Sequence, residues 1–214
     1  MATAPKKQTE IVEKKTSTAI ANIDPNLPAH LQGKGPARGQ ENVSAEDLVI
    51  PRLELVQGLS PCLKESDSAY IEEAKIGHLY NNVTRELYGR SIDVIPVYFK
   101  KEYIVWKNRK LGGGFIGAFS TMEAAEEIRN VQDKPDEHQT NETANMFCLL
   151  VNPATNRLEE IVVSMAITKL KVSRKWNSLI RLAGGDSFSR VYTLGSGEEQ
   201  NKANESYMNY TIKS

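Results

Sequence analysis

Residues 168–181 read TKLKVSRKWNSLIR, a stretch in which the helical spacing of apolar residues coincides with a cluster of positive charge. Four apolar residues recur at i, i+3, i+4 and i+7, which marks one helical face: Trp176, Leu179, Ile180 and Ala183. Lys171, Arg174 and Arg181 fall on the opposite face, and residues 184–185 (Gly-Gly) end the helix. The stretch therefore predicts an amphipathic helix that packs Trp176 into a core, rather than against a base, and turns its basic face outward.

Positive charge is concentrated around this helix. Residues 164–190 contain six Lys or Arg and one acid, Asp186, whereas the whole chain of 214 residues balances 27 basic against 27 acidic residues. With a net charge of zero, a nucleic-acid site has to arise from local clustering. No acid stands at i+4 on the basic face to neutralise it. We expect phosphate contacts from Lys169, Lys171, Arg174, Lys175 and Arg181, and the alternative is a solvated helix face.

A second basic and aromatic cluster occupies residues 98–110, YFKKEYIVWKNRK. Strand alternation would place Tyr103, Val105 and Lys107 on one face, and Ile104 and Trp106 on the other. One face has to be core, and the other can offer a ring for base stacking, worth about 1–3 kcal/mol per base. The candidate binding residues are Lys100, Lys101, Tyr103, Trp106, Lys107, Arg109 and Lys110. A β-hairpin with aromatic packing and a basic turn is the alternative.

The remaining pattern predicts a tail followed by one domain. Residues 1–44 carry no sustained apolar period, so we expect a flexible tail. Residues 45–214 are expected to form a single nucleic-acid-binding domain that begins with a short helical turn capped by Ser44. Residues 49–56 are apolar enough to pack on the core, as a strand or as irregular chain, and residues 60–75 form a short helix or a loop.

β-Strands are expected over much of this domain. The predicted strands cover 76–83, 91–99, 103–107, 115–119, 146–151, 158–165, 187–194 and 206–212, with 103–107 either separate from 91–99 or its continuation. Turns and loops are expected at 86–90, 111–114, 133–143, 152–156 and 197–205. The capping box that starts at Ser120 opens a helix at 122–130. Together these elements favour an α+β, β-rich fold, and a small barrel of the oligonucleotide-binding (OB) type with inserted helices fits the pattern.

No arrangement of side chains points to catalysis. His30, His78 and His138 lack the spacing of metal ligands, and nothing places a Ser, a His and an Asp together as a triad. Residues 112–114 (Gly-Gly-Gly) lack the Lys-Ser/Thr that follows a phosphate-binding loop. Residues 159–160 (Glu-Glu) fit the solvent face of a strand better than a nuclease metal site. We therefore expect a protein that is not an enzyme, with no cofactor and no metal.

The cysteines and the hydropathy bear on the compartment. Cys62 and Cys148 are far apart and share no ligand spacing, so they are read as reduced thiols of the cytoplasm. No apolar run approaches the roughly 20 residues that cross a bilayer, and the first residues lack the apolar core of a secretory signal. We expect a cytoplasmic protein without a membrane partner.

Three runs carry a resemblance to known proteins: SMAITKLKVSRKWNSLIRLAGGDSFSRVY (164–192), PRLELVQGLSP (51–61) and IGHLYNNVT (76–84). They look like a group of small phage-encoded proteins of replication regions, and residues 169–172 and 176–177 resemble phage single-stranded DNA-binding proteins with an OB fold. The resemblance covers the layout of residues 50–213. It implies sequence-independent binding of single-stranded DNA in phage replication or recombination, in the host cytoplasm. Partners would be single-stranded DNA and phage replication proteins, and self-association into a homo-oligomer stays open.

One departure concerns the C-terminus. Proteins of that class often end in an acidic tail with a terminal aromatic residue, whereas residues 210–214 read YTIKS. Partner docking would then be absent, or lie in the acidic loops at 133–142 and 198–205, or the analogy fails. The alternative function is a phage virion or host-takeover protein that acts by protein–protein binding. A nuclease or recombination enzyme would need a metal-binding carboxylate cluster.

Overall fold

The computed structural model describes residues 42–214 except 153, 156 and 202. The expected flexible tail lies outside the described residues up to residue 41. Residues 42–48 belong to an N-terminal unit and contain the 3₁₀ turn η2, Ala45–Asp47. The expected short helical turn is therefore confirmed. The Ser44 hydroxyl donates to the Asp47 carboxylate at 2.8 Å, in place of the capping bond expected of it. Residues 49–214 form a second compact unit, which contains both sheets and both α-helices of the described chain.

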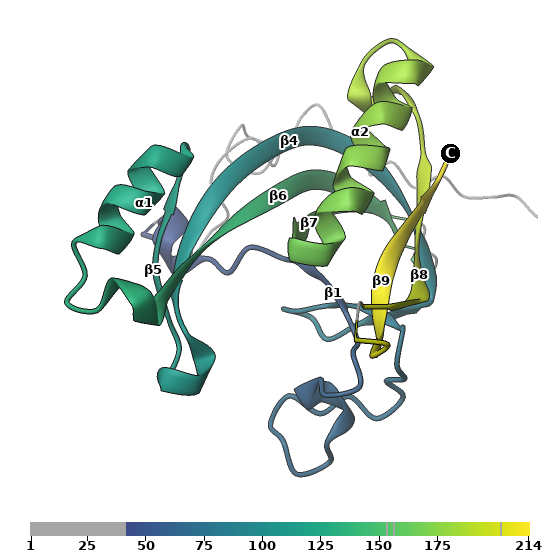
Figure 1. Ribbon diagram of the computed structural model, residues 1–214. Coiled ribbons are helices and arrows are strands. Elements are labelled where there is room, and N and C mark those ends of the chain that lie inside the picture. The colour runs from purple at the N-terminus through teal and green to yellow at the C-terminus, as the bar shows by residue number, and fades with distance from the viewer. Residues whose placement is uncertain (1–41, 153, 156, 202) are drawn as a thin grey trace, which may run out of the picture. The chain divides into compact units, whose positions relative to one another are not determined.

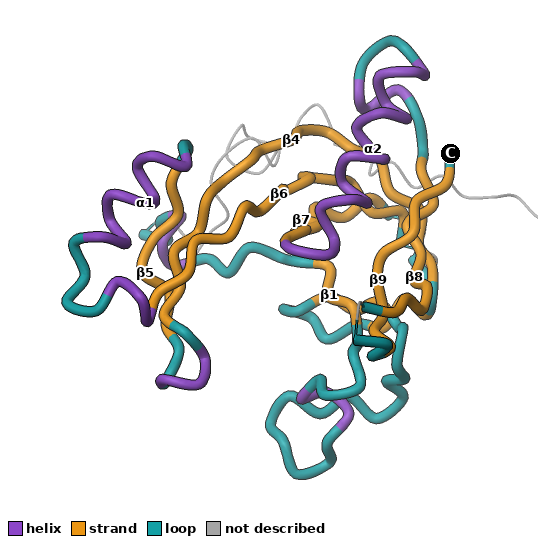
Figure 2. Tube along the Cα trace, in the orientation of Figure 1, coloured by secondary structure: helices purple, strands orange, loops and turns teal. Residues whose placement is uncertain are grey.

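Two antiparallel sheets make up residues 49–214 (Figures 1 and 2). The smaller sheet has the order β1-β2-β3: Leu53–Leu55, Leu79–Asn81 and Leu87–Gly89. The larger has the order β7-β6-β4-β8-β9, with β5 also paired to β4. Its strands are β4 Ser91–Lys107, β5 Gly114–Phe119, β6 His138–Val151, β7 Leu158–Ala166, β8 Tyr192–Gln200 and β9 Ser206–Lys213. The helices are α1 Met122–Asn130 and α2 Leu170–Ala183, with 3₁₀ turns η3 Pro61–Leu63, η4 Arg109–Leu111, η5 Pro135–Glu137, η6 Ile167–Lys169 and η7 Ser187–Ser189.

Strand β4 is 17 residues long and organises the larger sheet. One edge pairs with β6 from Asp93 to Lys107. The other edge pairs with β8 over residues 91–94 and with β5 over residues 103–107. Val97 is an extra residue in the ladder with β6, and such a bulge bends a strand, in keeping with the arch of β4 in Figure 1. Of the two alternatives, residues 103–107 therefore continue the strand that begins at 91.

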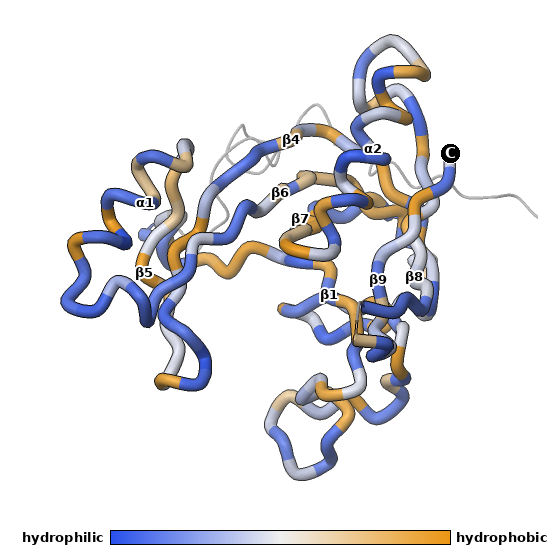
Figure 3. Tube along the Cα trace, viewed as in Figure 1, coloured by the Kyte–Doolittle hydropathy of each residue, from blue (hydrophilic) through white to orange (hydrophobic). Residues whose placement is uncertain are grey.

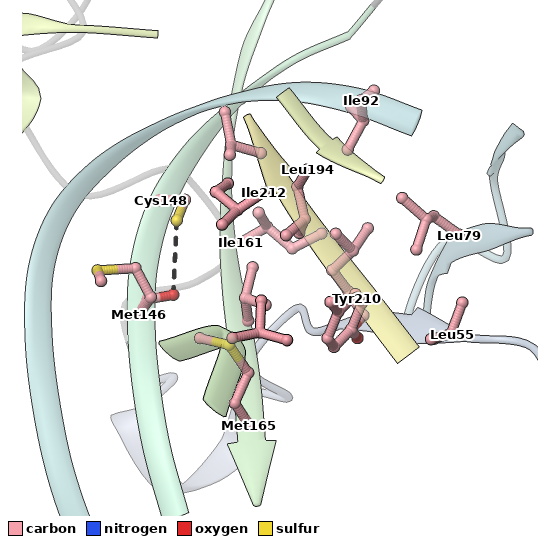
Figure 4. Packing of buried hydrophobic residues seen from close by; sticks show 14 of the residues in the cluster. Leu55, Leu79, Ile92, Met146, Cys148, Ile161, Met165, Leu194, Tyr210 and Ile212 are labelled. Atoms are coloured by element: carbon pink, nitrogen blue, oxygen red, sulfur yellow. Dashed lines mark hydrogen bonds between the residues drawn. The ribbon is translucent and has the colours of Figure 1, made fainter. Parts of the chain in front are cut away.

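The hydrophobic core joins both sheets and α2. Figure 4 shows Leu55 and Leu79 of the smaller sheet in one cluster with Ile161 and Tyr210 of the larger sheet. The Tyr210 hydroxyl donates to the carbonyl of Leu53 at 2.8 Å, which ties β9 to β1. The core is thus built from strands that are far apart in sequence.

Helix α2 ends at Ala183 with Gly184 as its C-cap, so the end predicted at residues 184–185 is confirmed. Trp176 is fully buried, and its ring lies 6.2 Å from that of Tyr192 in β8, so the prediction that Trp176 belongs to the core is confirmed. At 14 residues α2 is well short of a bilayer span. Across the described chain, no helix combines the length and apolarity needed to cross a membrane.

Residues 51–57 run between the two edge strands of the larger sheet. The carbonyl of Pro51 accepts from the Val162 amide of β7 at 2.9 Å. The Gln57 amide side chain exchanges hydrogen bonds of 2.7 and 2.9 Å with the Met208 backbone of β9. These are single contacts and not a ladder, so the sheet stays open between β7 and β9 in the described chain. The α+β, β-rich class is confirmed, but the expected OB-type barrel is not closed.

Several expected boundaries are wrong where the pairing partner is distant in sequence. The turn expected at 86–90 contains β3, which pairs with β2. Residues 138–143, expected to be a loop, begin β6 because they pair with the second half of β4. Residues 197–200, also expected to be a loop, extend β8 along β9, whereas the segment at 187–189 is η7 and not a strand.

The N-cap of α1 lies one residue later than the capping box that starts at Ser120 predicts. The Thr121 hydroxyl accepts from the Ala124 amide at 3.2 Å, so Thr121 is the N-cap in place of Ser120. An N-cap residue has extended backbone angles, and Thr121 has φ −126° and ψ 155°. The predicted helix at 122–130 is otherwise confirmed.

Candidate nucleic-acid interface

Two of the predicted cations lie at the N-terminal end of α2, and each contacts a side chain of the last two strands. Lys169 Nζ lies 4.6 Å from the centroid of the Tyr210 ring, a cation–π distance. Burial lowers the pKa of this half-buried lysine. Lys171 Nζ lies 2.6 Å from Glu199 Oε2 in β8. Both ammonium groups are therefore held by residues of the last two strands.

Glu199 is the centre of a small polar network. Its carboxylate also accepts from the Tyr207 hydroxyl at 2.8 Å and from the Asn209 side chain at 2.9 Å. The hydrogen bond from Lys171 is the main reason that the pKa of Glu199 lies below its usual value, and the same bond raises the pKa of Lys171. Lys171 is therefore neutralised by Glu199 of β8, although no acid stands beside it along the helix.

The other three helix cations are exposed. Arg174, Lys175 and Arg181 have no carboxylate oxygen within 4.0 Å in the described residues. Lys175 borders a depression of about 300 Å³ between α2 and β9, together with Lys171 and Glu199. This part of α2 can therefore offer positive charge to a polyanion.

In the middle of β4, both predicted lysines form ion pairs. Lys100 Nζ lies 2.6 Å from Glu102, and Lys101 Nζ lies 3.2 Å from Glu142 of β6. Asn145 continues the first pair by donating to Glu102 at 2.7 Å. Figure 3 colours this part of β4 as hydrophilic, but its positive charge is largely compensated.

The hairpin of β4, η4 and β5 holds the remaining predicted residues. Arg109 and Lys110 lie in η4, are exposed, and have no carboxylate oxygen within 4.0 Å in the described part of the chain. Lys107 lies 4.0 Å from Glu137, at the limit of an ion pair. The Asn108 side chain accepts from the Lys110 amide at 3.0 Å. Gly112 closes the turn with φ +96°, a conformation that disfavours a residue with a side chain.

The two faces of the end of β4 are distinguished by burial. Val105 is fully buried, with Tyr103 and Lys107 half-buried on the same side, so this face is the packed one. Trp106 points the other way and keeps 37% of its surface exposed. The sequence left open which face is core. Of the two predicted stacking rings, Trp106 is the more exposed and Tyr103 belongs to the packed face.

Phe115 is a candidate that the sequence prediction missed. It pairs with Trp106 across the β4–β5 ladder, at a centroid distance of 5.4 Å and an interplanar angle of 69°. Its side chain is 58% exposed. If the predicted strands 103–107 and 115–119 are paired as a hairpin, the sequence brings Phe115 close to Trp106. Which residue lies opposite Trp106 depends on the bulge at Ile116, and the sequence does not reveal that bulge. Trp106 and Phe115 therefore form an exposed aromatic pair next to Arg109 and Lys110, hereafter the hairpin site.

The helix and the hairpin site lie at different ends of β4 (Figure 1). Helix α2 packs near β7 and β9, whereas the hairpin site extends from the C-terminal end of β4. Within the described residues, no group of three or more His, Cys, Asp or Glu side chains is placed to hold a metal ion.

Comparison with known proteins gives one match. The family model described as Pam3 phage gp34-like protein matches residues 15–214, nearly the whole chain. Neither the curated proteins nor the solved structures contain a match.

Proposed function

This chain belongs to the Pam3 phage gp34-like family, and we propose that it binds single-stranded DNA with little sequence preference, as a protein of phage replication or recombination without enzymatic activity. Family membership supports the phage origin. The DNA-binding part of the proposal rests on the geometry of the hairpin site. It does not require a closed OB barrel, because the residues involved lie on one hairpin.

The exposed pair of Trp106 and Phe115 is the observation that carries the proposal. Large aromatic rings at the surface offer stacking platforms for bases, and stacking tolerates every base because each has a π-face. Arg109 and Lys110 stand in the adjacent turn without a carboxylate partner in the described chain, where they can contact phosphates. Rings beside unpaired cations suit a single strand better than a duplex, whose bases are already stacked.

The exposed cations of α2 support the same reading. Arg174 and Lys175 carry uncompensated charge on the face of the helix that is turned from the core. Phosphate contacts of this kind add affinity without reading sequence. We therefore expect binding to depend strongly on salt and only weakly on base composition.

Fluorescence anisotropy of a labelled oligo-dT of about 20 nucleotides tests the proposal with the full chain. The slope of log K against log salt should be about −0.7 for each phosphate neutralised. Changing Arg109 and Lys110 together to Ala should remove one to two phosphate contacts, which makes the slope shallower by about 0.7 to 1.4. It should also weaken binding at low salt. The matched control changes Lys64 and Lys75 to Ala, because both are exposed lysines outside the two clusters and their loss alters net charge equally.

Two results would count against the proposal. The first is an absence of salt-dependent binding to oligo-dT at low ionic strength, which would favour the alternative of a phage protein that binds other proteins. The second is an equal loss of affinity in both double variants, since that would reduce binding to a general effect of net charge. Cleavage of the oligonucleotide in the presence of magnesium would overturn the statement that the protein is not an enzyme.

A further inference from the structure

Between its two partner strands, β4 has an open edge. Strand β8 ends its pairing at Val94 and β5 begins at Tyr103, so residues 95–102 have no strand beside them on this edge in the described chain. Alternate residues of a strand direct their backbone groups to opposite edges. The backbone amide of Asn108 donates to the carbonyl of Glu137 on the β6 side, so even-numbered residues after the bulge direct their backbone groups toward β6. The odd-numbered residues Phe99 and Lys101 therefore direct theirs toward the open edge.

The connection from α2 to β8 lies against this open edge. In η7, the Ser187 hydroxyl donates to the carbonyl of Val97 at 3.0 Å. The guanidinium of Arg190 donates to the carbonyl of Ala183, the last residue of α2, at 3.1 Å. These two bonds hold the α2–β8 loop, residues 184–191, between the end of the helix and the middle of β4.

Apolar side chains are exposed at this place. Phe188 of η7 is 58% exposed, Val97 is 42% exposed, and Leu182 near the end of α2 is 84% exposed. Arg181 lies beside Leu182 and has no carboxylate oxygen within 4.0 Å in the described residues. Exposed apolar side chains on the loop and at its two anchor points mark an interaction surface, and the exposed cation of Arg181 indicates the charge of its partner.

We propose that the α2–β8 loop is a second contact for the DNA strand that the hairpin site binds, with a base against Phe188 and a phosphate at Arg181. The inference rests on the proposed function and extends it from a single site to a path along the open edge of β4.

The length of β4 sets the spacing of the two contacts. Val97 and Trp106 are nine residues apart along β4, which corresponds to at most about 30 Å of strand. A stacked single strand advances about 3.4 Å per nucleotide and would cover that distance in about nine nucleotides. An oligonucleotide of about four nucleotides spans roughly 14 Å and can occupy one contact only.

The test compares Phe188→Ala with wild type on short and long oligo-dT, of about four and about 20 nucleotides. Quenching of tryptophan fluorescence reports the hairpin site, because Trp106 is exposed and Trp176 is fully buried. For the long probe, the expected affinity of Phe188→Ala is about tenfold weaker, as for the loss of one stacked base. For the short probe, quenching should keep the wild-type midpoint. Phe188→Tyr retains a ring and should restore binding of the long probe.

The outcomes separate this inference from the function on which it rests. If wild type binds the long probe and Phe188→Ala binds it equally well, the second contact is wrong while the hairpin site stands. Equal weakening on both probes would also overturn it, because Phe188 would then act at the hairpin site. If wild type binds neither probe, the proposed function itself fails. Far-UV circular dichroism of each variant checks that the exposed substitution leaves the fold intact.

Discussion

At the residue scale, Lys171 shows how a strand distant in sequence changes the meaning of a basic helix. Its position on the outward face of α2 follows from the sequence period alone. The ion pair that neutralises Lys171 does not follow from the sequence, because Glu199 belongs to β8 and reaches Lys171 only in the folded chain. Lys169 is similar, because the Tyr210 ring that it contacts comes from β9. The charge available at the helix is therefore smaller than the sequence indicates.

Glu199→Gln should make the protein bind oligo-dT more tightly. The substitution releases Lys171 from its carboxylate partner while keeping an amide that can bond to Tyr207 and Asn209. One additional free cation should tighten binding at low salt by about threefold to tenfold and steepen the salt dependence by about 0.7. Anisotropy titrations over a range of salt concentrations measure both quantities. An unchanged affinity would mean that Lys171 does not reach the DNA.

The same carboxylate gives stability a defined pH dependence. Because Lys171 holds the pKa of Glu199 below its usual 4.5, Glu199 stabilises the fold above that pH, and the stabilisation is lost as pH falls through the lower folded value. The difference in unfolding free energy between wild type and Glu199→Gln should therefore be largest above pH 4.5 and should vanish in stronger acid. Urea unfolding at several pH values measures it, and a difference that grew in acid would contradict the assignment.

Trp176→Ala tests the structural role assigned to the helix tryptophan. Removing a fully buried indole leaves a cavity and should lower the free energy of unfolding by about 3–5 kcal/mol. Leu182→Ala on the same helix is the matched control, because Leu182 is 84% exposed, and it should change stability by less than about 0.5 kcal/mol. Urea denaturation midpoints compare the two. A small effect of Trp176→Ala would place Trp176 outside the core.

At the element scale, local signals were sufficient for the helices and for the hairpins with close partners. The hairpin of β6 and β7, the helix α2 and the strand at 115–119 follow from apolar period and turn residues near one another. The start of β6 at His138 was missed because its residues are polar, and their pairing with the second half of β4 is a non-local contact. A polar stretch becomes a strand there because β4 supplies the backbone partners.

Thr121→Ala measures which residue caps α1. The Thr121 hydroxyl accepts the Ala124 amide at 3.2 Å, so its loss should cost about 0.5–2 kcal/mol of stability. Ser120, the cap expected from the sequence, is exposed, and Ser120→Ala should have little effect. Thermal unfolding of the two variants compares them directly, and the reverse order of effects would restore Ser120 as the N-cap.

At the scale of the whole compact unit, residues 49–214, only part of the candidate site can be predicted from the sequence. The sequence identified Trp106 and its basic neighbours as candidates, because aromatic and basic residues alternate there. It did not identify Phe115, whose pairing with Trp106 depends on hairpin register. The open edge of β4 was also beyond reach, since it is defined by where β8 and β5 stop pairing, and both limits are tertiary.

The exposed ring of Trp106 is expected to contact DNA, and an oligo-dT titration of Trp106→Ala measures that contact. Loss of one stacked base, worth about 1–3 kcal/mol, should weaken binding by roughly fivefold to more than a hundredfold. Trp106→Phe keeps a ring against Phe115 and should stay within about threefold of wild type. If Trp106→Ala, shown to be folded, bound oligo-dT as tightly as wild type, the hairpin would not be the DNA-binding site.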